Sequence, residues 1–185
     1  MEELFNEYIL AFDEINALTA YIYSNSNNAI DDILSILINA YRQGTEVASK
    51  MLNYEVNADT EDMLEAIYVL IDGKTWEDRA REHIDSNNMS ELQTLVESEY
   101  HRIYNTAIQN TAESYHIETG STVTKTWITL KDNKVRETHR YLEGMTVGID
   151  EMFVTYDRDF AQYPGGFTKA GNNVNCRCVI RLNNS

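Results

Sequence analysis

The sequence predicts an α+β fold, in which a helical N-terminal part leads through a long connecting helix into a small antiparallel or mixed sheet with a short helix. Pro164 is the only proline, so nothing obstructs helix formation in residues 1–118. Apolar residues recur there at intervals of three and four, which is typical of the buried face of a helix. Beyond Gly120 β-branched residues alternate at period two, which is typical of strands. We therefore expect a mainly helical part over residues 1–118 and a compact α+β unit over residues 119–185.

Turn-forming and capping residues divide the helical part into segments. The first helix is expected from about Glu2 to Tyr23, with an apolar stripe made of Leu4, Phe5, Tyr8, Phe12, Ile15, Leu18 and Ile22. A second helix follows a cap at Asn27 or Asn28 and stops at Gly44. Further segments are expected at 45–56, 61–72 (ended by Gly73), 76–84 (capped by Thr75) and 90–116 (started by a Ser90–Gln93 capping box).

The C-terminal unit is expected to contain strands separated by a short helix. The strand-like segments are STVTKTWITL at 121–130, MTVGIDEMFVTY at 145–156 and NCRCVIRL at 175–182. A polar turn at residues 131–134 follows the first of them and leads into the short helix, which carries Arg136 and His139 on one face.

The net charge of −15 is concentrated in the first part of the chain. Residues 1–72 contain 14 acidic residues against Arg42 and Lys50, whereas residues 73–185 contain 16 acidic and 13 basic residues. An acidic set of helices repels nucleic-acid phosphates and favours a basic protein surface as a partner. The alternative is that these charges only form solvated helix faces.

Hydropathy and cysteine content set the expected compartment. No stretch approaches ~18 consecutive apolar residues, and the N-terminal MEELFNEYIL is acidic where an export signal would be basic. We therefore expect a soluble cytosolic protein without an export signal. Two cysteines in that setting indicate reduced thiols, metal ligands or core residues rather than a structural disulfide.

The long helix places a carboxylate on its buried stripe. At ~100° per residue, the stripe consists of Leu92, Leu95, Val96, Glu99, Ile103, Thr106 and Asn110. Arg102 lies three residues beyond Glu99 and can pair with it, as a buried carboxylate requires. The pair is interpreted as structural, docking the helix on the sheet, in preference to catalysis.

Both cysteines lie one residue apart near the end of the chain. On a strand, Cys176 and Cys178 face one side and Arg177 the other. The two thiols can be a buried apolar pair, two ligands of a zinc ion or a disulfide. Zinc would take His139 as a third ligand and Asp132 or His116 as a poor fourth, although zinc-binding cysteines are usually spaced more widely. These alternatives stay open at the level of the sequence.

Taken in order, these motifs resemble the C-terminal domain of the Mu F-like phage head morphogenesis family. The resemblance rests on Glu99-x-x-Arg102-x-x-Asn105, Gly120, Trp127, the Arg136-x-x-His139 pair, Leu142, Gly144, Pro164 and the Asn175–Cys178 run. The segment GKTWEDRAREHI, centred on Trp76 and Arg79, is similar to the upstream part of the family, so residues 73–118 are expected to be family-like helices. The resemblance covers about residues 73–182 and departs from the family at the lysine-containing turn 131–134.

The resemblance implies a structural protein of bacteriophage virions rather than an enzyme. It implies a minor head protein at the head interior or portal region, present in the host cytoplasm during assembly. Portal and capsid proteins are the implied partners, non-specific contact with phage DNA is compatible with it, and no membrane is involved in the assembled head. No cofactor is expected, with zinc as the alternative named above.

The expected arrangement of this unit is a polar cluster between the long helix and the sheet. Its members are Glu99, Arg102, Asn105, Arg136, His139, Asn175 and Arg177, and the accompanying core positions are Trp127, Gly144 and Pro164. Buried polar networks of this kind can specify one packing arrangement.

Two other functions are compatible with part of the sequence. A small enzyme acting on nucleic acid or phosphate substrates would use Glu99 or His139 as a base and Arg136 on phosphate. The chain nevertheless lacks a carboxylate cluster for two-metal chemistry, a Gly-rich phosphate loop and a nucleophile elbow. A DNA-binding module is disfavoured, because residues 124–185 carry nine basic against seven acidic residues and no basic stripe.

Overall fold

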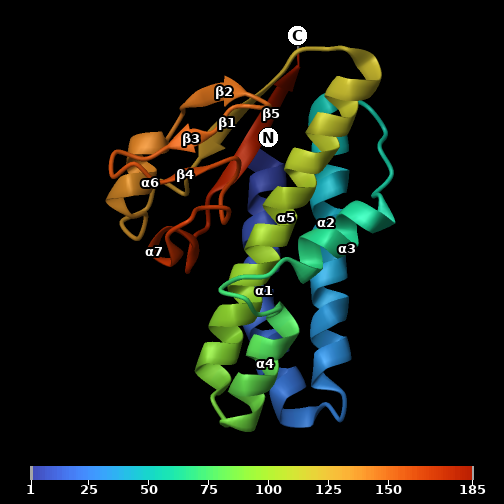
Figure 1. The fold of residues 1–185 in the computed structure, drawn as a ribbon, viewed down its shortest axis with the longest axis vertical. Helices are drawn as coiled ribbons and strands as arrows, with labels where there is room; N and C mark the ends of the chain where they lie inside the picture. Colours follow the sequence, from blue (N-terminus) through green and yellow to red (C-terminus); the bar gives the residue numbers. More distant parts are fainter. Residues whose placement is uncertain (1, 185) are drawn as a thin grey trace.

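The structure is a computed structural model that describes the backbone of residues 2–184 and the side chains of residues 14–184. Its helices are α1 (Glu2–Asn25), α2 (Ala29–Leu52), α3 (Thr60–Tyr68), α4 (Trp76–Asp85), α5 (Met89–Thr119), α6 (Glu137–Leu142) and α7 (Ala170–Asn173). Its strands are β1 (Val123–Ile128), β2 (Thr146–Gly148), β3 (Phe153–Val154), β4 (Phe160–Ala161) and β5 (Val179–Asn184). The predicted α+β class is confirmed, with the helices first and small antiparallel sheets at the end (Figure 1).

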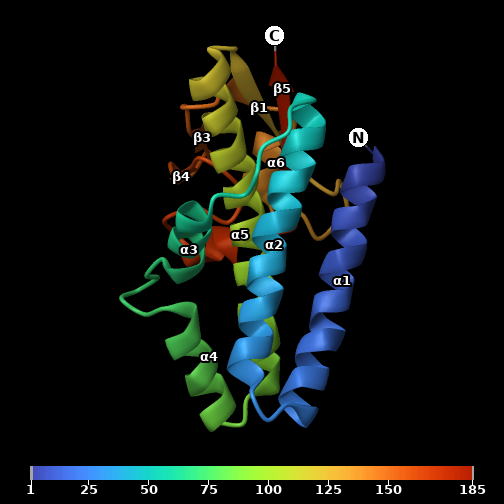
Figure 2. The ribbon, with the colours of Figure 1, turned by 90° about the vertical axis from the view of Figure 1, so that its right-hand side faces the viewer.

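Helix α5 is the central element of the molecule. Helices α1 and α2 run along it over most of their length, and the shorter α3 and α4 pack against it as well (Figures 1 and 2). The sheet lies beside its C-terminal half (Figure 1). Because neighbours surround it, every residue from Glu99 to Gln109 is buried, which is the pattern of a helix enclosed by the core.

Helix α2 runs through Gly44, so the prediction that this glycine ends a helix is wrong. An added Cβ at Gly44 would lie 2.3 Å from the Tyr104 carbonyl oxygen and 2.7 Å from the Ala107 Cβ. Gly44 therefore allows α2 and α5 to approach closely, and the packing gain outweighs its weak helix propensity. The segments expected at 28–44 and 45–56 are one helix as a result, and it ends at Leu52.

Other helix ends partly agree with the sequence. Thr75 caps α4 in a capping box, although with Asp78, and Gly120 ends α5 in the left-handed conformation at φ 70°. Helix α5 begins at Met89, where the Asn88 side chain accepts from the Glu91 N–H, so the capping box expected at Ser90 is wrong. Helix α3 ends at Tyr68, well before Gly73.

The apolar stripe of α1 is confirmed only in part. Ile15 and Ile22 are buried, whereas Leu18 is 44% exposed. The expected stripe residues Leu4 to Phe12 lie outside the described side chains.

The main sheet is antiparallel with the order β2-β1-β5, and its register pairs Trp127 with Ile180. The expected strand at 145–156 divides into β2 and β3, and β3 pairs with β4 in a separate hairpin. The prediction that the cysteines lie within the last strand is wrong, because β5 begins at Val179. Cys176 and Cys178 occupy the segment directly before it.

The buried apolar side chains of the helices and the sheet form one cluster. Trp127 is fully buried in it, against the rings of Phe153 and Phe167. Pro164 is buried too, and an added Cβ on its neighbour Gly165 (φ 91°) would lie 3.0 Å from the Arg102 Cα. The proline-containing loop is thus held directly against α5.

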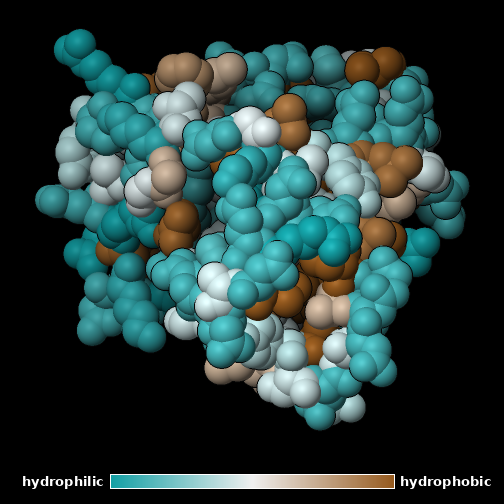
Figure 3. Space-filling view, turned by 60° about the horizontal axis from the view of Figure 1, so that its bottom comes forward, coloured by the Kyte–Doolittle hydropathy of each residue, from teal (hydrophilic) through white to brown (hydrophobic). Residues whose placement is uncertain are grey.

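The face of the molecule at one end of the helices is largely hydrophilic (Figure 3). Seen toward one end of the helices, hydrophilic side chains dominate, and hydrophobic ones appear mainly in hollows between them (Figure 3). None of the described helices is both long enough and apolar enough to cross a membrane.

Candidate functional site

The first group of expected site residues is an ion cluster on the helical side of the molecule. Glu99 on α5 is 3% exposed and accepts from the guanidinium groups of Arg79 at 2.9 Å and Arg102 at 2.7 Å. The pairing of Glu99 with Arg102 agrees with the sequence, whereas Arg79 on α4 is an additional partner. Both carboxylate oxygens are bonded, so this cluster joins α4 to α5 and is internally satisfied.

A second group ties α5 to the segment before β5. The His101 Nε2 lies 2.8 Å from the Cys178 carbonyl oxygen, to which it must donate, since a carbonyl only accepts. The Asn105 side-chain NH2 also donates to the Cys178 carbonyl, at 3.4 Å, and to the His101 carbonyl, at 3.0 Å. These bonds fix the backbone beside the cysteines.

Arg136 and Arg177, the two arginines on the sheet side of the molecule, form hydrogen bonds that hold loops in place. Arg136 donates to the carbonyl oxygens of Gly171 and Val174, and so holds the α7 turn. Arg177 pairs with Asp132 in the 131–134 turn at 2.9 Å, directed away from the cysteines. The seven predicted cluster residues therefore divide into two sets: Glu99, Arg102 and Asn105 make contacts of α5, whereas Arg136, His139, Asn175 and Arg177 line one pocket on the sheet side.

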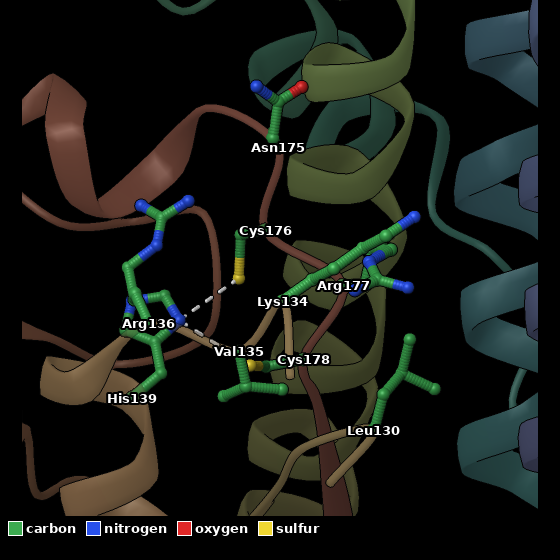
Figure 4. Close-up of a pocket in the computed structure, with 9 residues that line it drawn as sticks. All are labelled: Leu130, Lys134, Val135, Arg136, His139, Asn175, Cys176, Arg177 and Cys178. Carbon is green, nitrogen blue, oxygen red and sulfur yellow. Dashed lines mark hydrogen bonds between the residues drawn. The ribbon is translucent and has the colours of Figure 1, made fainter. Parts of the chain in front are cut away.

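A third group brings together Cys176, Cys178 and His139. The Sγ atoms of both cysteines lie 3.5 Å from the His139 Nδ1, and all three ligand-type atoms lie within 4.8 Å of one another. All three side chains are buried, and both cysteines are free thiols. Figure 4 shows the imidazole reaching from α6 toward the two sulfur atoms.

Local backbone geometry explains how sequence neighbours form this group. Asn175 adopts a left-handed conformation at φ 55°, which asparagine tolerates better than most residues, and turns the chain out of α7. The segment then leads toward β5 and places the sulfur atoms of both cysteines at the same distance from His139 on α6. The His139 ring is held by Phe167, stacked at 5.4 Å, and by Trp127, edge-on at 5.3 Å.

The two thiols differ in their affinity for a proton. Burial raises the pKa of Cys176, but the hydrogen bond from Cys178 and the charge and hydrogen bond of His101 outweigh it, so this pKa lies well below the usual value. The pKa of Cys178 lies well above the usual value, because it donates to the Cys176 sulfur and is buried. Cys176 is therefore the more acidic thiol of the pair.

A small pocket borders this group. It measures about 10 Å³ and is lined by Leu130, Lys134, Val135, Arg136, His139, Asn175, Cys176, Arg177 and Cys178 (Figure 4). Such a volume accommodates about one water molecule. Two sulfur atoms and one imidazole nitrogen beside it can hold a soft divalent metal or present a thiolate.

Three buried polar residues of this region were not predicted from the sequence. His101 was hidden because α5 is buried on every side, so no polar face reveals which residues carry contacts. Lys125 is fully buried and donates to Gln109 and to the Ile149 carbonyl, although it sits in the alternating strand pattern. Asp159 accepts from the Asn172 amide and from the backbone N–H groups of residues 168 and 169, which shapes the loop before α7.

The fold and site define a small α+β protein with a buried thiol–imidazole group and a separate structural ion cluster. The sequence matches the family described as "Phage Mu protein F like protein" over residues 60–181, which is more than half of the chain. The chain therefore belongs to the phage Mu protein F-like family, and this membership relates it to bacteriophage head proteins. Helices α1 and α2 lie outside the match.

One curated relative is a protein of Enterococcus faecalis named NAD(+)--arginine ADP-ribosyltransferase EFV. It is 29% identical over 150 residues, which are 80% of this chain but only 30% of the relative. The chain thus spans less than a third of the length of this relative. No solved structure matches the chain.

Proposed function

We propose that the chain is a minor head protein that associates with portal and capsid proteins during head morphogenesis and has no catalytic activity of its own. Its place would be the head interior or portal region of the virion. Membership of the Mu F-like family carries the proposal. The internal satisfaction of the Glu99 cluster also supports it, because such clusters specify packing rather than chemistry.

The acidic helices supply the proposed contact with partners. Residues 1–72 hold 14 of the 30 acidic residues, and exposed ones lie on α1, on α2, beyond the end of α2 and on α3, among them Glu14, Glu46, Glu55 and Glu65. An exposed acidic surface attracts a basic one and accelerates the encounter at low salt. We propose that this surface contacts a basic face of the portal or capsid protein.

Co-purification with the portal protein of the same phage tests this proposal. We expect complex formation that weakens as salt rises and that is lost in a triple variant Glu14→Gln, Glu46→Gln, Glu55→Gln. The matched control removes the same charge elsewhere, by Glu91→Gln, Glu137→Gln and Asp150→Asn, all exposed. Equal loss in both variants would contradict a specific acidic surface, and no complex with the unaltered chain would overturn portal association.

An enzymatic role is the competing function. The structure separates Glu99 from His139 and Arg136, the residues that would have to act together in such an enzyme. Glu99 is bonded to Arg79 of α4 and Arg102 of α5, and it does not line the pocket of His139 and Arg136. A base and a phosphate-binding group that do not share a pocket do not make a common site.

Activity assays test the absence of catalysis. The purified chain would be incubated with NAD+ and an arginine-containing acceptor, since the Enterococcus faecalis relative is named for that transfer, and with single-stranded DNA and a phosphate ester. We expect no turnover. Product formation that disappears in His139→Gln but persists in His83→Gln would overturn the non-enzymatic proposal.

Contact with phage DNA is proposed to be weak and independent of sequence. The C-terminal unit has only a small excess of basic residues, so few phosphate contacts are available. Binding to random duplex DNA should be measurable only at low salt and should fall off with a shallow salt dependence. Tight binding with a steep salt dependence would contradict this part of the proposal.

A further inference from the structure

We propose that Cys176, Cys178 and His139 bind one zinc ion that fastens helix α6 to the segment before β5. From the sequence, a zinc site is one of three alternatives for the two cysteines, together with a buried apolar pair and a disulfide. The sequence does not give the distances between the three side chains. The three ligand-type atoms come from segments separated by nearly 40 residues and converge in one buried place. Metal binding goes beyond the proposed role in the phage head and does not depend on it.

The interatomic distances match a tetrahedral zinc site. Zinc lies about 2.3 Å from a cysteine sulfur and about 2.0–2.1 Å from a histidine nitrogen. With tetrahedral angles, these lengths place sulfur and nitrogen about 3.6 Å apart. Both cysteine sulfurs lie 3.5 Å from the His139 Nδ1, so an ion fits between them with little rearrangement.

Hydrogen bonds alone satisfy the group poorly. The His139 Nδ1 has one position for a hydrogen bond, yet two sulfur atoms lie at the same distance from it. An ion bound between the three atoms contacts all of them at once. A bound zinc ion also replaces the protons of its thiol ligands, which are released to solvent, and its charge compensates the two sulfurs in the buried site.

The surroundings of the group are suited to a bound metal. The His101 Nε2 and the Asn105 side-chain NH2 both donate to the Cys178 carbonyl oxygen, and so fix the backbone of a ligand residue as outer partners of a metal site do. Arg136 and Arg177 are bonded to backbone carbonyls and to Asp132, so they leave the sulfur face open. The pocket of about 10 Å³ next to the group provides room for a water molecule as fourth ligand.

The other two sequence-level alternatives leave this geometry unexplained. An apolar thiol pair would need no imidazole nitrogen aimed at both sulfurs. In a disulfide, neither sulfur could donate a hydrogen bond to His139 or bind a metal as a thiolate. Both cysteines are free in the structure. Soft sulfur and imidazole ligands favour zinc over magnesium or calcium.

Metal analysis of the purified chain tests the proposal directly. After expression in zinc-supplemented medium and dialysis, we expect about one zinc ion per chain. A strong chelator should remove this ion, and with it the link between helix α6 and the segment before β5. Substitution by Co²⁺ should produce a sulfur-to-cobalt charge-transfer band and intense visible bands of tetrahedral coordination. Alkylation of Cys176 and Cys178 should be slow with zinc and fast after chelation, a readout that requires no variant.

Variants locate the ion. Cys176→Ser and His139→Gln should each weaken zinc binding by more than about 100-fold, since even an outer-shell change costs about 10–100-fold. The control His83→Gln alters a histidine of α4 outside the cluster and should retain the ion. The proposal would be overturned by a chain that contains no metal and whose thiols are alkylated rapidly even when zinc is present. It would also be overturned by a chain whose mass is lower by two hydrogens, because that mass indicates a Cys176–Cys178 disulfide.

Discussion

Two buried groups of polar side chains differ in how fully their bonding capacity is met. In the Glu99 cluster, two guanidinium groups donate to the two oxygens of one carboxylate, so the buried anion is fully paired and hydrogen-bonded within the protein. In the Cys176–Cys178–His139 group, three electron-pair donors face one another and the His139 Nε2 has no hydrogen-bond partner among the described residues. A balanced cluster, whose hydrogen bonds are met within the protein, holds a fold together, whereas an unbalanced one marks a place for something to bind.

The largest effect on stability is expected when the balanced cluster loses the Glu99 carboxylate. Glu99→Ala leaves Arg79 and Arg102 facing each other without a carboxylate, so the free energy of unfolding should fall by about 3–5 kcal/mol. Urea denaturation followed by circular dichroism measures it. As a control, Glu77→Ala breaks an exposed pair with Arg81 and should cost less than about 1 kcal/mol. Similar losses in both variants would show that the buried Glu99 cluster contributes no more to stability than an exposed ion pair.

A smaller effect is expected from separating α2 from α5, the helix that carries contacts to both groups. In Gly44→Ala the new Cβ meets the Tyr104 carbonyl, and we expect a loss of about 1–3 kcal/mol from overpacking. Gly171→Ala is the matched control, because nothing lies within 4 Å of its added Cβ. A Gly44→Ala chain as stable as the control would show that the close helix contact does not contribute to stability.

Lys125 is intermediate between the Glu99 cluster and the cysteine group, because it is a buried cation whose hydrogen-bond partners are all neutral. Burial lowers its pKa to about 8, although Glu113, Asp150 and Glu151 act in the opposite direction. The folded state therefore binds this proton more weakly than the unfolded state does. Between pH 8 and the usual lysine value near 10.5, the unfolded chain carries more protons, so this residue makes stability rise with pH.

The test of that intermediate case is a comparison of two pH profiles. Lys125→Met should remove a rise on the order of 1–2 kcal/mol between pH 8 and pH 10, as measured by urea denaturation at each pH. Lys131→Met, an exposed lysine, should leave the profile unchanged. Parallel profiles for the wild type and Lys125→Met would contradict a depressed pKa.

The smallest effect is expected at the cap that positions the balanced cluster. Thr75→Ala removes the N-cap of α4, which carries Arg79, and should cost about 1 kcal/mol. Thr75→Ser keeps a capping hydroxyl and should restore most of the stability. The rate of thiol alkylation should stay the same in both variants, since α4 contributes nothing to the cysteine group. A faster alkylation would show that the two groups are coupled.

The features that could be predicted from the sequence are those with local causes. Apolar spacing predicted the helices, alternation predicted β1, and Thr75 and Gly120 were recognised as helix ends because caps act within a few residues. The Glu99–Arg102 pair was predictable for the same reason, since residues three apart share a helix face. Gly44 and Ser90 were misjudged because packing against α5 and a nearby better cap decided those positions.

The candidate site was predictable as a set of residues but not as an arrangement. Cys176, Cys178 and His139 were recognisable as possible ligands from their types and spacing. The part played by His101 was not recognisable, because α5 is enclosed on all sides and its polar residues follow no exposed face. Nor could the sequence show that Arg136 and Arg177 serve separate loops, since those bonds join residues more than 30 positions apart.

Composition, periodicity and short-range spacing are properties of the chain, so they are enough to predict the α+β class, the acidic character of the first helices and the ordered motifs of the Mu F-like family. Three other features became known from the fold alone: α2 passes Gly44 unbroken, Glu99 has a second arginine, and two sulfurs and one imidazole nitrogen converge. Each of these depends on contacts between distant segments. Such contacts are established by the packing of the whole core around α5, which no local pattern encodes.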